Sequence, residues 1–148
     1  MLDIIIVEDN KVHMEALEEL LLEMENIQIF KAYNLAEAYY MLSLNDFNVF
    51  IIDIILNTDT KGDVSGIELV NHIREIKKYE FTPVIFITSL EDPKLCAYRD
   101  LHCYQYIEKP FDREYVRKTI RQALRYCNQS EPKAIAYFRK DGVLYSVK

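Results

Sequence analysis

The sequence has few of the residues that build fibres, linkers and disulfide frameworks. Only three glycines and four prolines occur among its 148 residues, which argues against a linker-rich or fibrous chain. Its three cysteines, Cys96, Cys103 and Cys127, are odd in number and lack C-x-x-C spacing. They predict reduced, mostly buried thiols of a cytosolic protein rather than a disulfide scaffold.

The chain also lacks long apolar runs. None approaches the roughly 18 residues that a membrane-spanning helix needs. The first ten residues, MLDIIIVEDN, contain no basic region and reach acidic residues at once, so they do not resemble a signal peptide. We therefore expect a cytoplasmic protein with no membrane partner.

Charge is unevenly distributed in a composition that predicts a soluble, globular chain. Half of the residues are apolar and 28% are charged, which excludes an intrinsically disordered chain. Residues 1–112 carry a net charge of −12 and residues 113–148 a net charge of +6. The acidic body is a poor partner for nucleic acid, whereas the basic end is either an interface or the start of a segment that binds nucleic acid.

Five short apolar runs alternate with five segments of helical periodicity. This alternation predicts a doubly wound, five-stranded parallel sheet with helices on both faces. Asn10 or Asp9, Asn34 and Asp112 are expected to cap helices. The expected strands are Leu2–Val7, Ile27–Lys31, Asn48–Asp53, Pro83–Thr88 and Tyr104–Ile107, and the expected helices are 11–25, Leu35–Leu44, Gly66–Tyr79, Asp92–Leu101 and Asp112–Tyr126.

The last twenty residues follow a different pattern, with a boundary near Ser130–Pro132. Two apolar, aromatic runs, 134–139 and 143–147, flank Lys140-Asp141-Gly142, which is a strong hairpin signal. A lone hairpin is only marginally stable. We therefore divide the chain into a domain at 1–128 and, at 129–148, a linker with a short β-hairpin-like tail that begins a truncated second domain.

Polar side chains stand at the carboxyl ends of the expected strands, where open parallel sheets bind ligands. Glu8 and Asp9 follow the first strand, Asp53 ends the third, Thr88 ends the fourth, and Lys109 follows the fifth. Three carboxylates in one pocket repel one another, and Mg²⁺, which prefers oxygen ligands, would relieve that repulsion. An ionised aspartate is a competent nucleophile towards phosphorus. Lys109 and Thr88 have the chemistry to neutralise and hydrogen-bond phosphoryl oxygens.

Five motifs carry a resemblance to a known family. They are Val7-Glu8-Asp9-Asn10, Ile52-Asp53-Ile54, Gly66-Ile67-Glu68-Leu69, Phe86-Ile87-Thr88-Ser89 and Tyr106-Ile107-Glu108-Lys109-Pro110-Phe111. In this order they resemble the receiver domain of two-component response regulators, over about residues 1–127. The resemblance implies a flavodoxin-like (βα)5 receiver fold and a phosphoprotein of phosphorelay signal transduction.

The resemblance also implies a role for each site residue. Asp53 is the phosphoacceptor for a sensor histidine kinase, in a Mg²⁺-dependent reaction that the domain itself catalyses, as it does the later loss of the phosphoryl group. Glu8 and Asp9 bind Mg²⁺ together with Asp53 and the main-chain carbonyl of Ile55. Thr88 and Lys109 respond to the phosphoryl group, and Tyr106 is the rotating aromatic of the switch. The Lys109–Pro110 bond is expected to be cis.

Two other functions compete with a signalling switch. A phosphatase or phosphotransferase with an aspartyl intermediate usually has a second acid two residues after the nucleophile, and that position holds Ile55, so we do not expect a turnover enzyme. A phosphorylation-independent interaction module is less favoured because the acids, Thr88 and Lys109 are all present. The stretch from Asp53 to Gly66 is longer than is usual for the family, and we expect a mobile loop or one that recognises a particular kinase.

The C-terminal part suggests partners. The tail resembles the opening strands of a LytTR-type domain, so we expect transcription regulation, with DNA bound only through the missing output domain. A stripe of basic residues is either a solvated helix face or a homodimer contact that involves the last strand and helices: Arg113, Arg117, Lys118, Arg121 and Arg125. The three histidines, His13, His72 and His102, show no metal-ligand spacing and are expected on the surface or in helices.

Overall fold

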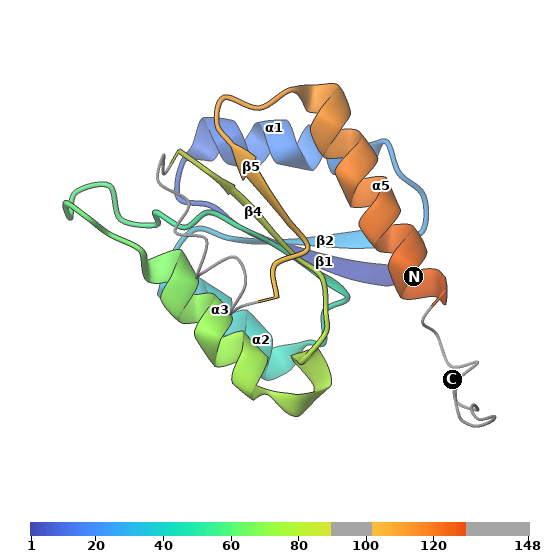
Figure 1. Cartoon of the computed structure of the whole chain (residues 1–148), viewed down its shortest axis with the longest axis horizontal. Coiled ribbons are helices and arrows are strands. Elements are labelled where there is room, and N and C mark those ends of the chain that lie inside the picture. Colours follow the sequence, from blue (N-terminus) through green and yellow to red (C-terminus); the bar gives the residue numbers. More distant parts are fainter. Residues whose placement is uncertain (90–101, 130–148) are drawn as a thin grey trace.

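A parallel sheet of five strands lies between two pairs of helices in the computed structural model, which describes residues 1–89 and 102–129 (Figure 1). The strand order is β2-β1-β3-β4-β5, and every neighbouring pair is parallel. The strands are β1 Leu2–Val7, β2 Ile27–Ala32, β3 Val49–Ile52, β4 Val84–Thr88 and β5 Gln105–Glu108. The helices are α1 Lys11–Leu22, α2 Leu35–Leu44, α3 Ser65–Glu75 and α5 Arg113–Gln129, with a 3-10 turn, η1, at Lys77–Tyr79.

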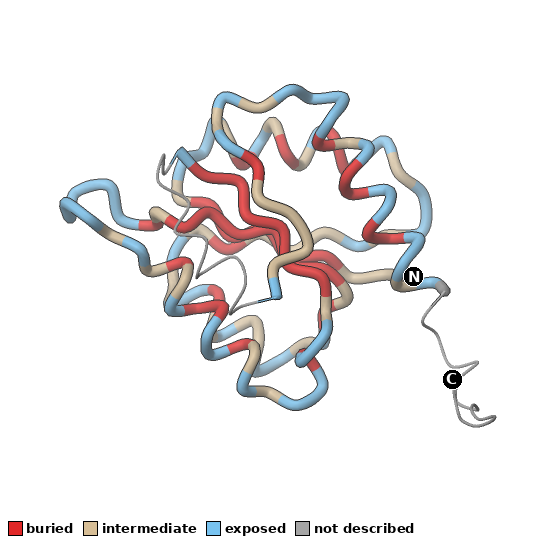
Figure 2. The backbone as a smooth tube through the Cα atoms, in the orientation of Figure 1, coloured by how far each residue is buried: buried red, intermediate tan, exposed pale blue. Residues whose placement is uncertain are grey.

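Side-chain alternation along the strands divides the core into two halves. Ile4 and Ile6 of β1 face one half, in which the inner faces of α1 and α5 pack, whereas Ile5 and Val7 face the other half, with α2 and α3. Because successive side chains of a strand point to opposite faces, a strand covered on both sides must be apolar throughout. β3 and β4, at the centre of the molecule, are buried along their whole length (Figure 2), and all their residues except Thr88 are apolar.

The predicted architecture is confirmed: the sheet is doubly wound, five-stranded and parallel, with the flavodoxin-like order. The predicted strand ends agree with the observed ones to within one residue. Asn10 and Asn34 cap α1 and α2, since their side chains accept hydrogen bonds from the amides of His13 and Glu37. The expected helix at 92–101 and the expected hairpin after residue 130 lie outside the described residues, and the division into two domains stays a prediction.

The single helix predicted for 66–79 is wrong in its last four residues. α3 ends at Glu75, Ile76 is extended, and η1 follows. The break lets Tyr79 turn inward, where it is 3% exposed and packs edge-on against Phe50 at a ring separation of 5.0 Å. Arg74 holds the turn by donating to the carbonyl oxygens of Tyr79 and Thr82, both at 2.7 Å.

Two residues of the basic stripe on α5 form ion pairs with acidic side chains of the same chain. Arg117 donates to both carboxylate oxygens of Glu23, at 2.9 and 3.2 Å, and Arg113 lies 3.6 Å from Glu19. Two members of the stripe therefore bind acids next to or within α1. Cys103 and Cys127 are half-buried, so they are less buried than expected. Within the described residues, no helix has the length and apolar character required to cross a bilayer.

Candidate functional site

The acidic residues follow β1 and β3, on either side of the point where the strand order reverses. Such a point is where open parallel sheets form their ligand crevice. The backbone ladder continues into both acids, because the Glu8 amide donates to the Ala32 carbonyl and the Asp53 amide to the Val7 carbonyl, each at 3.0 Å. Their side chains are consequently fixed at one edge of the sheet.

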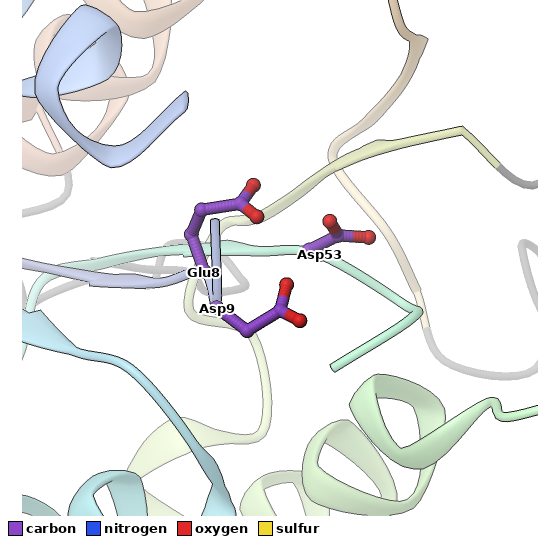
Figure 3. A group of neighbouring side chains, drawn as sticks. All are labelled: Glu8, Asp9 and Asp53. Carbon is purple, nitrogen blue, oxygen red and sulfur yellow. The ribbon is translucent and has the colours of Figure 1, made fainter. Parts of the chain in front are cut away.

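The three carboxylates gather in one place (Figure 3). One oxygen from each of Glu8, Asp9 and Asp53 lies within 4.8 Å of the others. Glu8 and Asp53 are only 1% and 4% exposed, and Asp9 is half-buried. The predicted convergence of these acids is therefore confirmed.

Lys109 places its ammonium between two of the acids. Its Nζ donates to Glu8 Oε1 and to Asp53 Oδ2, both at 2.8 Å, and its side chain is 9% exposed. The backbone amide of Lys109 donates to the Thr88 carbonyl at 2.9 Å, which sets the start of the loop after β5. The Lys109–Pro110 bond is cis, as the sequence resemblance implied.

The electrostatics of the cluster leave it short of positive charge. Burial, together with the nearby charge of Asp53, raises the pKa of Glu8 to about 7, although Lys109 acts in the opposite direction. Burial alone would lower the pKa of Lys109, but its hydrogen bonds to Asp53 and Glu8 outweigh burial and raise it. One ammonium thus does not neutralise three carboxylates that share a pocket.

These residues fit a hard divalent cation. Carboxylate oxygens that converge within a few ångströms are the donors that Mg²⁺ selects, and Mg²⁺ retains several waters, so a few protein oxygens suffice. A cation there would also relieve the repulsion that raises the pKa of Glu8. The donor set contains no thiolate, which makes it less suited to softer metals.

The remaining predicted site residues lie in the loop after β3 and in β4 and β5. The amide of Ile55 donates to Asp53 Oδ1 at 3.0 Å. Thr88 is the last residue of β4 and is fully buried. Tyr106 is half-buried in β5, and its ring lies beside Phe86 of β4 with centroids 6.3 Å apart. The two switch residues therefore belong to β4, which is next to β3, and to β5, which is next to β4.

His13 is a neighbour of the site that the sequence did not reveal. Its Nδ1 lies 2.8 Å from Lys109 Nζ and 4.0 Å from Glu8 Oε2. Burial and the adjacent charge of Lys109 lower the pKa of His13, so the neutral ring accepts a hydrogen bond from the ammonium. Only one signal in the sequence pointed to this contact. His13 lies in the first turn of the helix that Asn10 caps, directly after the two acids at the end of β1.

Comparison with known proteins is consistent with this geometry. The profile of the response regulator receiver domain matches residues 4–121. This chain belongs to that family. Among solved structures, the receiver domain of an HD domain-containing protein from Pseudomonas fluorescens superimposes with a TM-score of 0.73 at 25% identity, covering 86% of this chain and 98% of that one.

Curated relatives of this receiver domain include proteins named for transcriptional regulation and for sensory transduction. The transcriptional regulatory protein CrdR of Helicobacter pylori is 32% identical over 80% of this chain and 53% of its own length. The sensory transduction protein LytR of Staphylococcus saprophyticus is 31% identical over 78% of this chain and 43% of its own length. The chain spans about half the length of the curated relatives that it matches.

Proposed function

We propose that this receiver domain accepts a phosphoryl group on Asp53 from a phosphohistidine of a sensor histidine kinase. The observation that carries the proposal is the buried contact of Lys109 with Asp53 and Glu8, beside a third carboxylate. A buried aspartate that shares an ammonium with other acids lies where a transferred phosphoryl group would meet positive charge. Membership of the receiver family supports the same assignment.

In the transfer, an oxygen of the Asp53 carboxylate forms a bond to phosphorus as the bond between phosphorus and the kinase imidazole breaks. The Ile55 amide, which donates to Asp53 Oδ1 at 3.0 Å, fixes the orientation of the carboxylate. Lys109 lies close enough to stay paired with the new phosphoryl oxygens. Positioning and neutralisation of charge are the main contributions that a protein makes to phosphoryl transfer.

The metal ligands in this proposal are the carboxylates of Glu8, Asp9 and Asp53 and the main-chain carbonyl of Ile55. Bound Mg²⁺ would supply the positive charge that the phosphoryl oxygens need beyond that of Lys109. The protein catalyses its own phosphorylation, and later its dephosphorylation, in this proposal, without turning over a separate substrate.

The output is a change of conformation. The acyl phosphate shifts an existing equilibrium between two packings of Thr88, Tyr106 and the adjacent elements. Relatives named as transcriptional regulators support a DNA-binding output domain, which we propose to be LytTR-like and to follow a linker that starts at residue 129. A homodimer through β5 and α5 is a further part of the proposal, with Lys118, Arg121 and Arg125 as its basic contacts.

A mimic of the phosphoryl group tests this proposal. Beryllofluoride with Mg²⁺ should change the tyrosine fluorescence of the chain, which contains eleven tyrosines and no tryptophan, and should leave Asp53→Asn unchanged. The same signal in Asp53→Asn would contradict the assigned acceptor. Continuous release of phosphate from acetyl phosphate, at a rate far above decay of the acyl phosphate, would indicate an enzyme instead.

A further inference from the structure

One carboxylate organises the long loop between β3 and α3. Four hydrogen bonds converge on Oδ2 of Asp63: from the Ser65 hydroxyl at 2.8 Å and from the amides of Leu56, Asn57 and Ser65 at 3.0, 3.1 and 3.3 Å. Burial acts to raise the pKa of Asp63, but these hydrogen bonds outweigh burial and lower it. Asp63 is therefore an ionised anchor for the first residues of the loop, where we had expected mobility or kinase recognition.

The bond from Leu56 to Asp63 has a consequence for Ile55. The amide N–H of Leu56 and the carbonyl of Ile55 belong to the same peptide unit, which is planar and trans, so the two groups point in opposite directions. Holding the N–H on Asp63 therefore directs the Ile55 oxygen away from Asp63.

The other side of Ile55 is held as well. Its own amide donates to Asp53 Oδ1 at 3.0 Å, next to the acidic cluster. Ile55 is thus tied to Asp53 on its N-terminal side and to Asp63 on its C-terminal side. With both adjacent peptide units restrained, the direction of its carbonyl is fixed.

We propose that Asp63 is a positioning residue for the metal site, because its bond to the Leu56 amide fixes the peptide that presents the Ile55 carbonyl. The inference rests on the proposed function, in which that carbonyl is a Mg²⁺ ligand. Mg²⁺ demands near-ideal octahedral geometry, so a ligand that turns away weakens binding. Groups that orient metal ligands typically change metal affinity by about 10- to 100-fold when they are removed.

Asp63 also has a purely structural role from which the proposal must be separated. Its bonds to the amide and hydroxyl of Ser65 help to begin α3, and losing them would lower stability without affecting the metal. The two roles use different partners on the same oxygen. Variants of the loop can therefore test them one at a time.

The experiment is calorimetric titration of the full chain with Mg²⁺ alone, at constant ionic strength. Asp63→Ala removes the acceptor and should weaken Mg²⁺ binding about 10- to 100-fold. Asp63→Asn keeps one acceptor oxygen and should retain most of the affinity. Two controls should bind Mg²⁺ like the unmodified chain: Asp59→Ala, which removes an exposed charge of the same loop, and Ser65→Ala, which removes the hydroxyl bond.

A second measurement needs no variant. In the unmodified protein, Mg²⁺ should shift the ¹³C resonance of the Ile55 carbonyl. This NMR measurement decides the outcome if circular dichroism shows that Asp63→Ala does not fold. The absence of a shift at the Ile55 carbonyl would overturn the inference.

Three results separate the inference from the function on which it rests. Equal Mg²⁺ affinity in folded Asp63→Ala and the unmodified chain overturns the inference and leaves the proposed function intact. Equal weakening in Asp63→Ala, Asp63→Asn and Asp59→Ala also overturns it, because charge alone would then explain the effect. If the unmodified chain binds no Mg²⁺, the metal dependence of the proposed function is wrong and the inference falls with it.

Discussion

At the scale of single residues, every N–H group of the Lys109 ammonium has a hydrogen-bond acceptor. Its three N–H groups have three acceptors at 2.8 Å, namely Glu8 Oε1, Asp53 Oδ2 and His13 Nδ1. An ammonium has three donors and no acceptor, so each bond that it makes to an incoming phosphoryl group must replace one of these. The resting geometry therefore links the arrival of a phosphoryl group to a rearrangement around Lys109.

Glu8 predicts a dependence of stability on pH in the metal-free protein. Its folded-state pKa of about 7 lies above the ordinary value of 4.5, so the folded state binds the proton more tightly than the unfolded state. The contribution of Glu8 to the free energy of unfolding is full below about pH 4.5 and is lost as the pH rises towards 7. The loss is on the order of 3 kcal/mol at most.

Urea denaturation in a chelator measures this effect, with Glu8→Gln as the matched control because it cannot ionise. Relative to Glu8→Gln, the unmodified protein should lose stability between about pH 4.5 and 7, and Mg²⁺ should reduce the loss. A difference between the two proteins that stays constant across this window would contradict the assigned burial of charge.

At the scale of elements, α3 approaches the acceptor loop so closely that only glycine fits at its second position. A Cβ on Gly66 would lie 2.1 Å from the Asp53 carbonyl oxygen and 2.6 Å from the Ile54 Cα. The amide of Gly66 donates to the Ile54 carbonyl at 2.8 Å. The start of α3 and the backbone of the acceptor are therefore in direct contact.

Gly66→Ala should push the start of α3 away from the backbone of Asp53 and Ile54. We expect a loss of about 1–3 kcal/mol, which is usual for overpacking, and slower phosphorylation of Asp53, because its backbone must shift. Gly62→Ala is the control: Gly62 has a φ of +77° and open space around it, so alanine should cost about 1 kcal/mol from backbone strain and leave phosphorylation unchanged. Urea denaturation and the rate with acetyl phosphate measure both effects, and equal phosphorylation in the two variants would refute the close contact.

Sequence patterns predicted the strands, the sheet and the convergence of acids because these depend on local periodicity and on a simple rule for parallel strands. They did not predict the end of α3 at Glu75, which depends on burial of Tyr79 against Phe50. They also missed His13, whose contact with Lys109 spans 96 residues. Asp63 stood out only as a charge in a long loop, since three of its four hydrogen-bond donors are backbone amides, which nearly every residue offers.

At the scale of the whole molecule, the described residues form two core clusters, one on each face of the sheet. Among these residues, the last buried member of a cluster is Leu124, and Cys127 packs against it. A chain that stops after Gln129 should therefore fold with the same melting temperature as the full chain and should be phosphorylated at the same rate. Thermal denaturation checks this, and a large drop in melting temperature would show that residues 1–128 are not a domain by themselves.

The charge pattern is consistent with a receiver that acts through other molecules. Residues 1–112 carry the net negative charge and hold the buried acidic cluster at one edge of the sheet. The net positive charge lies in residues 113–148, which start with α5. In α5, Arg113 and Arg117 bind acidic residues of the same chain. Contacts with partners should therefore depend on the other members of the basic stripe, Lys118, Arg121 and Arg125.

The most direct test of the account is the intact mass of the protein after incubation with acetyl phosphate. With Mg²⁺ present, the unmodified chain should gain the mass of one phosphoryl group, and it should gain none in a chelator or when Asp53 is replaced by Asn. Borohydride reduction followed by peptide mapping should locate the modification at Asp53. A chain that gains no phosphoryl group in Mg²⁺, or an Asp53→Asn variant that gains it as readily, would contradict the central claim.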